Sequence, residues 1–132
     1  MPSVFSKIVA GEIPCYKIAE DAHYLAFLDV FPLRKGHSLV IPKKEVDYIF
    51  DLDRETYLGL MDFSRRVGDA IQKAVPCKRL SMQVIGLEVP HAHVHLIPIN
   101  TMNDCDFKQQ KLKFSKEEFE ETARLIASKF VK

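Results

Sequence analysis

Residues 91–99 read HAHVHLIPI, with histidine at every second position of the first half. If this stretch is a β-strand, its side chains alternate between two faces, so His91, His93 and His95 share one face at spacings of about 6–7 Å. A strand that faces a core normally carries aliphatic residues there. Burying an imidazole without a partner costs about 1–3 kcal/mol. Because the whole chain has five histidines, chance clustering is a poor explanation, and the run predicts a functional site.

Two kinds of chemistry fit three imidazoles on one strand face. Histidine is the commonest metal ligand, and its proton also moves near neutral pH. A metalloprotein would use His91, His93 and His95 as ligands, although a catalytic zinc also needs an open coordination position. A phosphorus-attacking histidine needs one neutral nitrogen facing the substrate, the other nitrogen held by an acceptor, and donors for the phosphoryl oxygens. The spacing alone leaves both alternatives open.

Segments with strand-forming composition surround the histidine run. Each is rich in aromatic or β-branched residues and is bounded by polar residues, proline or glycine. The last two are separated by a short turn around Gly86, so we expect them to pair antiparallel. The predicted strands are residues 16–18, 24–30, 37–41, 80–85 and 91–99.

Two helices carry clear end signals. Asp53 can cap a helix whose apolar residues recur at helical spacing until Pro76 ends it. Ser115 and Glu118 form a capping box for a terminal helix over about residues 115–131, with Phe114 and Phe119 placed as a hydrophobic staple. Residues 100–114 are polar and unpatterned and predict a loop. The fold class that follows is α+β, with an antiparallel five-stranded meander sheet and two main helices on one face.

Length and charge limit the kind of protein. A chain of 132 residues can bury one core, so we expect a single domain over residues 1–132. Its formal net charge of +1 gives no reason to expect a nucleic-acid partner. No apolar stretch approaches the roughly 20 residues that a bilayer crossing requires, so no membrane partner is expected either.

The cysteines and the amino terminus point to a compartment. The three cysteines are widely spaced, without a CxxC pair, and no basic-then-apolar signal segment precedes them. A reducing, cytoplasmic location is the expectation. The cysteines are Cys15, Cys77 and Cys105.

The histidine run resembles the signature of the histidine triad (HIT) family. FSKIVAGEIP at residues 5–14, YLAFLDVFP at 24–32 and GHSLVIPKK at 36–44 resemble other segments of its bacterial members, in the same order. The resemblance covers about residues 3–99 and implies a HIT-like fold. Similarity to the Hint-like branch further implies a homodimer, with the sheet extended across the two copies.

The resemblance implies a hydrolase acting on purine nucleotides (AMP, GMP or their conjugates). His93 would attack the α-phosphorus and form a nucleotidyl-histidine that water then hydrolyses, with a backbone carbonyl fixing its tautomer. His91 and His95 would bracket the phosphate, and His37 matches a fourth histidine near the site. Adenosine phosphoramidates are the leading substrates. The alternatives are dinucleoside polyphosphates, or nucleotide binding with weak or no turnover.

The same resemblance assigns the nucleoside pocket. Asp29 matches an acid that accepts the ribose hydroxyls, which suits a carboxylate with two oxygens. Apolar positions match those that sandwich the base, although composition alone would make them simple core residues. The base-binding positions are Phe5, Ile8, Ile13, Phe27 and Val30.

Two departures from the family pattern bear on cofactors and contacts. Many bacterial relatives hold a structural zinc with an amino-terminal CxxC, a later histidine and the first triad histidine. Ser3, Ser6 and Glu45 stand at three of these positions here, so no zinc is expected and no cofactor is required. The segment before the triad is also short, with Gln83 the candidate for a lost asparagine contact and Glu88 for a backbone amide contact.

Overall fold

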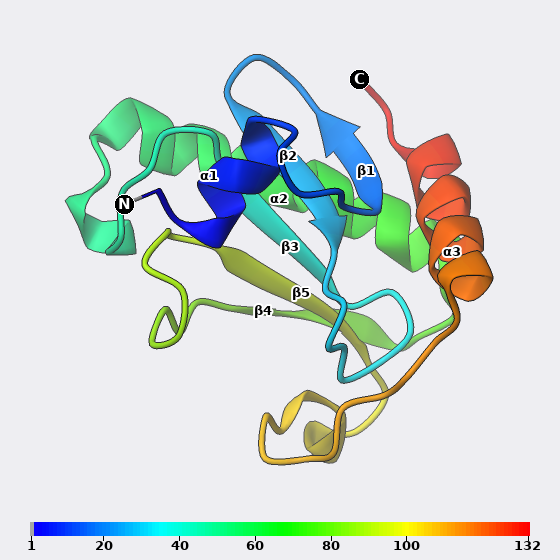
Figure 1. The fold of residues 1–132 in the computed structure, drawn as a ribbon. Coiled ribbons are helices and arrows are strands. Elements are labelled where there is room, and N and C mark those ends of the chain that lie inside the picture. The colour runs from blue at the N-terminus through cyan, green and yellow to red at the C-terminus, as the bar shows by residue number, and fades with distance from the viewer. Residues whose placement is uncertain (1) are drawn as a thin grey trace.

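A computed structural model describes residues 2–132 and contains one five-stranded antiparallel sheet (Figure 1). The sheet order is β1-β2-β3-β5-β4, so the predicted five antiparallel strands are confirmed. The order departs from a simple meander because β5 lies between β3 and β4. The strands are β1 Lys17–Glu20, β2 Tyr24–Leu28, β3 Ser38–Pro42, β4 Arg79–Gln83 and β5 Val94–Ile99.

The long helix α2 (Arg54–Ala74) explains this order. It follows β3 and carries the chain along the sheet, so β4 lies at an edge and β5 returns to fill the gap between them (Figure 1). His95 of β5 is therefore paired with Leu39 on one side and Gln83 on the other. Directly opposed residues of antiparallel strands point to the same face, so these three side chains share one face of the sheet.

The helices begin where the sequence predicts. Asp53 accepts a hydrogen bond from Thr56 N at the start of α2. The terminal helix α3 (Lys116–Lys129) begins with the Ser115–Glu118 capping box, and the rings of Phe114 and Phe119 contact each other at a centroid distance of 5.6 Å. A short helix α1 (Val4–Val9) and the 3₁₀ turns η1 (Ile49–Asp51) and η2 (Met102–Cys105) complete the elements.

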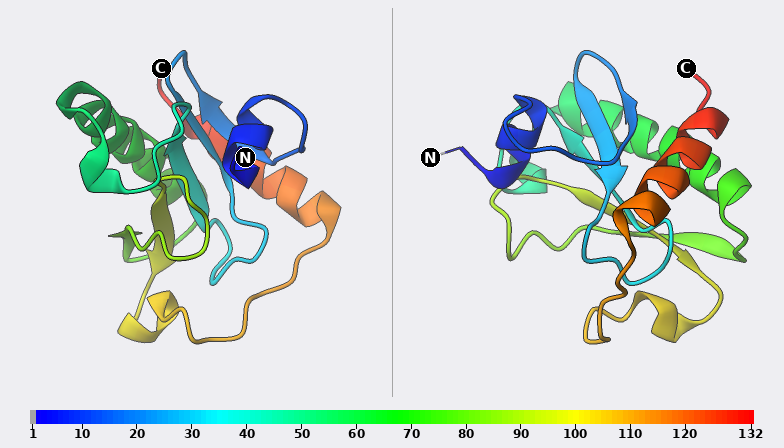
Figure 2. Two further views of the ribbon diagram at one scale, coloured as in Figure 1. Left: turned by 60° about the vertical axis from the view of Figure 1, so that its left-hand side comes forward. Right: turned by 45° about the vertical axis from the view of Figure 1, so that its right-hand side comes forward.

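The sheet is covered differently on its two faces (Figure 2). On one face α2 and α3 pack against Ala26, Val40 and Val94, and they form the larger apolar cluster. On the other face α1 contributes Phe5 to a smaller cluster around Phe27. Fully burying one such aromatic side chain contributes about 1.5–3 kcal/mol. The two main helices share a face as predicted, whereas α1 leaves part of the opposite face for the histidines.

The start of β5 differs from the prediction. The strand begins at Val94 rather than His91, and residues 84–93 form a connecting loop instead of a short turn. The loop has its own backbone partners, because Ala92 N donates to Val46 O at 2.7 Å and His91 N donates to Val89 O at 2.8 Å. These bonds keep His91 and Ala92 out of the sheet.

The loop that leads into β3 requires a glycine. Gly36 has φ +90°, a conformation that residues with a Cβ rarely adopt. A Cβ at this position would also lie 3.0 Å from Val75 Cγ2. The turn places His37 immediately before β3, so the backbone freedom of Gly36 sets the position of a buried imidazole.

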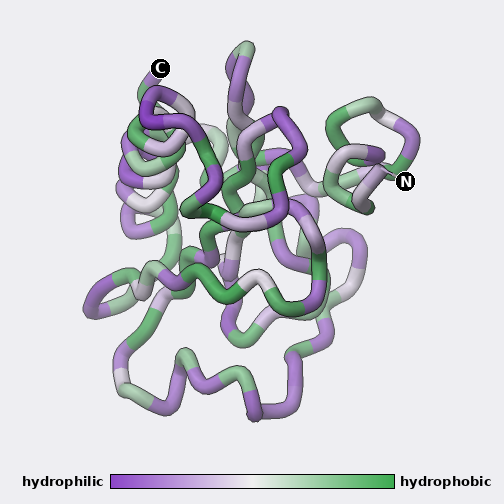
Figure 3. Tube along the Cα trace, turned by 90° about the vertical axis from the view of Figure 1, so that its left-hand side faces the viewer, coloured by the Kyte–Doolittle hydropathy of each residue, from purple (hydrophilic) through white to green (hydrophobic). Residues whose placement is uncertain are grey.

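The chain after β5 runs below the sheet and is hydrophilic along much of its trace (Figure 3). Apart from η2, residues 100–114 have no regular structure, close to the predicted loop. Among the helices in residues 2–132, we find none with the length and apolarity to cross a membrane.

Candidate active site

Three imidazoles gather where β3 and β5 meet, on the face that α1 only partly covers. His93 directly precedes β5, His95 lies within it, and His37 precedes β3. All three are buried, with exposed fractions of 6%, 8% and 1% respectively. The rings of His93 and His95 lie 5.0 Å apart between centroids, so two histidines of the triad are in contact.

One nitrogen of His93 is committed to a backbone carbonyl. His93 Nδ1 lies 2.7 Å from His91 O, and a carbonyl oxygen only accepts hydrogen bonds. The proton of neutral His93 is therefore on Nδ1, which leaves the Nε2 lone pair available. A neutral imidazole with one nitrogen held by an acceptor is the form that a nucleophile requires.

His37 and His95 form a second chain whose proton positions follow from their partners. Leu33 N donates to His37 Nδ1 at 3.0 Å, so the His37 proton is on Nε2. His37 Nε2 lies 3.0 Å from His95 Nδ1 and donates to it. The proton of neutral His95 is then on Nε2, which makes this nitrogen a donor.

Burial keeps both members of this pair uncharged. Together with a smaller contribution from the positive charge of Lys111, it lowers the pKa of His37 to about 3. The pKa of His95 is also lowered to about 3, first by burial and then by the neighbouring imidazoles His37 and His93. Both rings are neutral near pH 7, as the assigned tautomers require.

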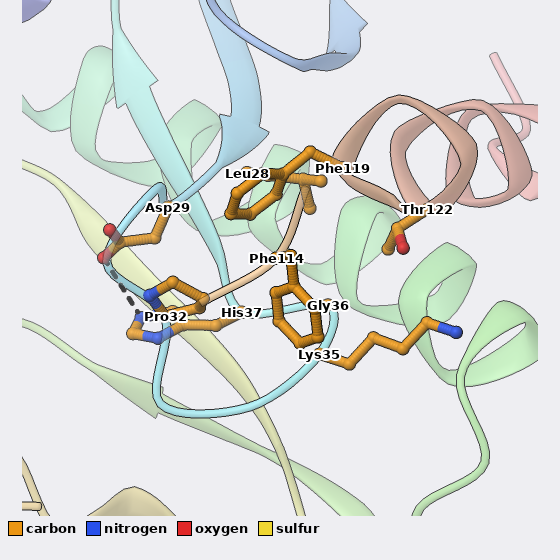
Figure 4. Close-up of a pocket in the computed structure, with 9 residues that line it drawn as sticks. All are labelled: Leu28, Asp29, Pro32, Lys35, Gly36, His37, Phe114, Phe119 and Thr122. Carbon is orange, nitrogen blue, oxygen red and sulfur yellow. Dashed lines mark ion pairs between the residues drawn. The ribbon is translucent and has the colours of Figure 1, made fainter. Parts of the chain in front are cut away.

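Asp29 lies at the end of this chain. Its Oδ2 is 3.5 Å from His37 Nε2, while its Oδ1 accepts a hydrogen bond from Phe31 N at 2.8 Å. Figure 4 shows the two side chains facing each other beside a small pocket, which Phe114, Phe119 and Thr122 close from the α3 side. The carboxylate thus lies within reach of the imidazole pair.

The prediction that His91, His93 and His95 all lie within one strand is wrong, because β5 begins at Val94. His91 still lies on the α1 side, with its ring 5.9 Å from the Phe5 ring between centroids. Its ring is completely buried. Its Nε2 donates to Pro42 O at 2.8 Å, and its Nδ1 accepts from Ser3 Oγ at 2.8 Å. The physical reason is that His91 precedes the strand and is held in the loop. Its contribution beside His93 is the carbonyl oxygen rather than the imidazole.

The residues at the zinc positions of relatives meet in space. Glu45 Oε1 accepts from Ser3 N and from Ser6 Oγ, each at 2.6 Å. Ser3 Oγ in turn contacts His91 and caps α1 by accepting from Ser6 N at 3.0 Å. These bonds lower the pKa of Glu45 to about 2, which keeps it anionic. We call Ser3, Ser6, Glu45 and His91 the amino-terminal network.

The predicted base-binding residues are only partly brought together. The Phe5 ring contacts Phe27 at 5.6 Å and His93 at 5.0 Å between centroids, and Ile8 packs against the same cluster. Ile13 is half-buried in the turn after α1, and Val30 is 49% exposed beside Asp29. Phe5, Phe27 and Ile8 therefore form an apolar wall next to His93.

The two candidates from the segment before the triad lie in different surroundings. Gln83 is opposite His95 in the sheet, but its amide nitrogen donates to Ser81 Oγ at 3.1 Å and to Cys105 O at 3.5 Å. Glu88 is exposed, and residues 2–132 give its side chain neither a hydrogen bond nor an ion pair. The structure thus places Gln83 near the histidines and Glu88 in the open loop.

Two residues near the histidines are missed by sequence reasoning. The Phe107 ring stands edge-on to His95 at 4.9 Å and to His37 at 6.0 Å between centroids. Lys111 Nζ donates to Phe107 O at 2.7 Å. Both belong to the stretch read as an unpatterned loop. The available signal was a single aromatic residue among polar neighbours, with a lysine four positions later.

Two sets of residues are candidate metal ligands: the three triad histidines, and the cluster of Asp29, His37 and His95. Within residues 2–132, the ligand atoms of Asp29, His37 and His95 lie within 4.8 Å of one another, whereas the His91 ring points elsewhere. However, His37 Nδ1 accepts from Leu33 N, so its Nε2 carries a proton rather than a lone pair. Binding a metal ion through His37 Nε2 would require this proton to move and the hydrogen bonds of His37 to break. The hydrogen-bonded His37–His95 pair therefore explains the cluster better than a metal site does.

Comparisons with known proteins bear on the family and the fold. The protein-family model described as "HIT domain" matches residues 10–102 of the chain. The chain is 38% identical over 99 residues to adenosine 5'-monophosphoramidase hnt1 of Schizosaccharomyces pombe, covering 74% of each chain. It superposes on a Hit-like protein of Bartonella henselae with a TM-score of 0.84, at 28% identity and over 97% and 96% of the two chains. A zinc-bound histidine triad family protein from Mycobacterium smegmatis gives 0.81, at 27% identity and over 96% and 91%.

Proposed function

The chain belongs to the HIT family, and we propose that it is a nucleotide hydrolase that cleaves purine nucleotide conjugates through a covalent intermediate on His93. The observation that carries the proposal is the bond from His93 Nδ1 to His91 O. It presents an unprotonated Nε2 beside His95, a second imidazole whose outward nitrogen is a donor. One ring supplies the nucleophile and the other a hydrogen bond for a phosphoryl oxygen.

In the first step His93 Nε2 attacks the α-phosphorus. A P–N bond to the ring forms, the bond to the leaving group breaks, and its electron pair departs with the leaving group. The ring becomes an imidazolium, whose charge the Nδ1–H bond to His91 O stabilises. His95 Nε2–H donates toward the phosphoryl oxygens as charge develops there. In the second step water attacks the same phosphorus, the P–N bond breaks with its electron pair returning to His93 Nε2, one proton of the water is released to solvent, and neutral His93 is restored.

The nucleoside is proposed to bind beside these histidines. Phe5, Phe27 and Ile8 would contact the base, because they form the apolar wall next to His93. Asp29 Oδ2 would accept a ribose hydroxyl, since its other oxygen already serves the local turn. Val30, Ile13, Gln83 and Glu88 remain weaker candidates, since none of them contacts this wall directly.

An adenosine phosphoramidate is the leading substrate, because the relative from S. pombe is named as an adenosine 5'-monophosphoramidase. A dinucleoside polyphosphate hydrolase, or a nucleotide-binding protein with little turnover, is the second candidate. We propose that no metal is required. The hydrogen bonds of the amino-terminal network and of the His37–His95 pair use the nitrogens and oxygens that a metal would need.

The proposal is tested by measuring AMP release from a fluorogenic adenosine phosphoramidate and from diadenosine tetraphosphate, with a chelator present. We expect turnover by the unaltered protein and loss of about 10³-fold or more in His93→Ala, with the circular dichroism spectrum unchanged. His23→Ala is the matched control, because the His23 side chain is exposed and its ring contacts Tyr24 rather than a triad histidine. Retained turnover in His93→Ala would contradict the mechanism. AMP binding without turnover in the unaltered protein would favour the binding-protein alternative.

Assembly and location are also proposals. Strand β4 is an edge of the sheet, and Met82, Val84 and Ile85 on it or just after it are exposed. An uncovered apolar edge favours pairing with a second chain, so we propose a homodimer, to be checked by light scattering. The free thiols of Cys15, Cys77 and Cys105 suit a reducing compartment such as the cytoplasm.

A further inference from the structure

The segment from Cys105 to Leu112 lies against the histidines from outside the matched HIT region, which ends at residue 102. We call it the post-triad strap. It passes below the sheet and then rises to α3 (Figure 2). Its Phe107 ring contacts His95 and His37 edge-on. One face of the imidazole pair is therefore covered by a residue that lies beyond the matched HIT region.

The strap is held at both ends. At its start, buried Asp104 pairs with Arg34 and also accepts from Asn100 N at 2.7 Å and Thr101 N at 3.0 Å. At its end, Leu112 N donates to Pro32 O at 2.8 Å. Arg34 and Pro32 both belong to the loop that leads to His37. The strap and the histidine loop are thus tied together, so Phe107 has a defined position rather than that of a free loop.

Lys111 brings an uncompensated positive charge to the same place. Its ammonium donates to Phe107 O at 2.7 Å and lies 5.4 Å from the Phe107 ring centroid. Within residues 2–132 no carboxylate lies within 4.0 Å of it. Its charge reaches the two imidazoles, because it contributes to the lowered pKa of both His37 and His95. A half-buried ammonium without an acidic partner raises the local potential and favours an anion.

We propose that the post-triad strap is part of the active site, and that Lys111 raises its activity on nucleotide conjugates whose leaving group is an anionic phosphate relative to its activity on conjugates whose leaving group is an amine. This inference rests on the function proposed above. When His93 Nε2 bonds to the α-phosphorus, the bond to the bridging oxygen breaks and its electron pair stays on the departing phosphate. That phosphate leaves as an anion and needs no proton, and Lys111 stabilises the added charge. A departing amine instead takes up a proton from water and leaves neutral, so the positive charge of Lys111 stabilises it less than it stabilises a departing phosphate.

Phe107 has a supporting role in this arrangement. Its ring shields the His37–His95 bond from water on one side, and its carbonyl oxygen holds the Lys111 ammonium. We therefore treat Phe107 as a positioning residue and Lys111 as the residue that determines leaving-group selectivity.

The test is the ratio of kcat/KM for diadenosine tetraphosphate to kcat/KM for an adenosine phosphoramidate. We expect Lys111→Gln to lower this ratio about fivefold, and Lys111→Arg to keep it within about twofold, because arginine retains the charge. Lys113→Gln is the matched control, since Lys113 is exposed on the same segment. Added salt should lower the ratio in the unaltered protein more than in Lys111→Gln, because salt screens the charge.

The outcomes separate this inference from the proposed function. An unchanged ratio in Lys111→Gln, or an equal loss on both substrates, would overturn the selectivity role while leaving the His93 mechanism in place. Turnover that survives His93→Ala would overturn the mechanism itself. Phe107→Leu should lower kcat for both substrates by a similar factor, and a change confined to the tetraphosphate would contradict its assignment as a positioning residue.

Discussion

His91 and His95 flank the proposed nucleophile His93 at equal distances along the chain, yet their rings have different hydrogen-bond partners. His95 lies in β5, faces His37 and presents a donor nitrogen beside His93. His91 precedes the strand, and both of its ring nitrogens are bonded to other parts of the chain. Equal spacing in a motif does not imply equal chemistry, because the hydrogen-bond partners of each ring decide which of its nitrogens remain available.

Of the two flanking histidines, His95 should give the larger functional loss when it is replaced, which sharpens this contrast. His95→Gln retains an amide oxygen that accepts from His37 Nε2, so the fold should be little affected. It removes the imidazole donor beside the phosphate, and we expect kcat to fall about 10³-fold. Steady-state kinetics together with the melting temperature measure both effects. A variant with near-normal kcat and a much lower melting temperature would reverse the roles assigned to the two histidines.

Replacing His91 should act mainly on stability. His91→Ala leaves Ser3 Oγ and Pro42 O in the interior without their partner, and we expect a loss of about 2–3 kcal/mol in the free energy of unfolding. The carbonyl that holds His93 remains, so the folded fraction should keep more activity than His95→Gln. Urea denaturation and kinetics at low temperature test this. Normal stability combined with abolished turnover would show that the His91 ring acts on the substrate after all.

The smallest effect concerns pH. The pKa of His37 is about 3 in the folded chain and about 6.5 when unfolded. Between these values the unfolded state binds the proton, so stability is fully present above about pH 6.5 and is lost as the pH falls toward 3. One such histidine contributes a loss of about 2 kcal/mol between pH 7 and pH 5.

Urea unfolding at pH 7 and pH 5 measures this loss, and His37→Asn is the control that should show a smaller difference. An equal difference in both proteins would assign the pH dependence to other groups, such as His95 or His91, whose pKa values are also lowered by burial.

Local signals were sufficient for much of this fold. The caps at Asp53 and Ser115 and the breaker Pro76 act within a few residues, so the two main helices could be read from the sequence. The sheet order and the start of β5 could not, because they depend on partners far along the chain, such as Val46 for Ala92. The alternating histidine pattern predicts a strand from His91 onward, whereas backbone pairing in the sheet starts only at Val94.

The same distinction applies to the site. The resemblance led to His37, His93, His95 and Asp29, and the structure brings these four side chains into one group. Phe107 and Lys111 have no periodic or motif context, and their position depends on the Arg34–Asp104 pair and on the bond to Pro32. Such contacts across about 70 residues leave no local signal in the sequence.

The position of β5 in the sheet has a consequence for how the protein is made. This strand is the last of the five to be synthesised, yet it lies between two strands that precede it. Until it inserts, β3 has an open edge and β4 has no neighbour, so a nascent chain lacks both a continuous sheet and the proposed nucleophile His93. Pairing between distant segments is slow to form. The proposed turnover would therefore report that folding is complete, whereas helix content can rise earlier through the locally signalled α2.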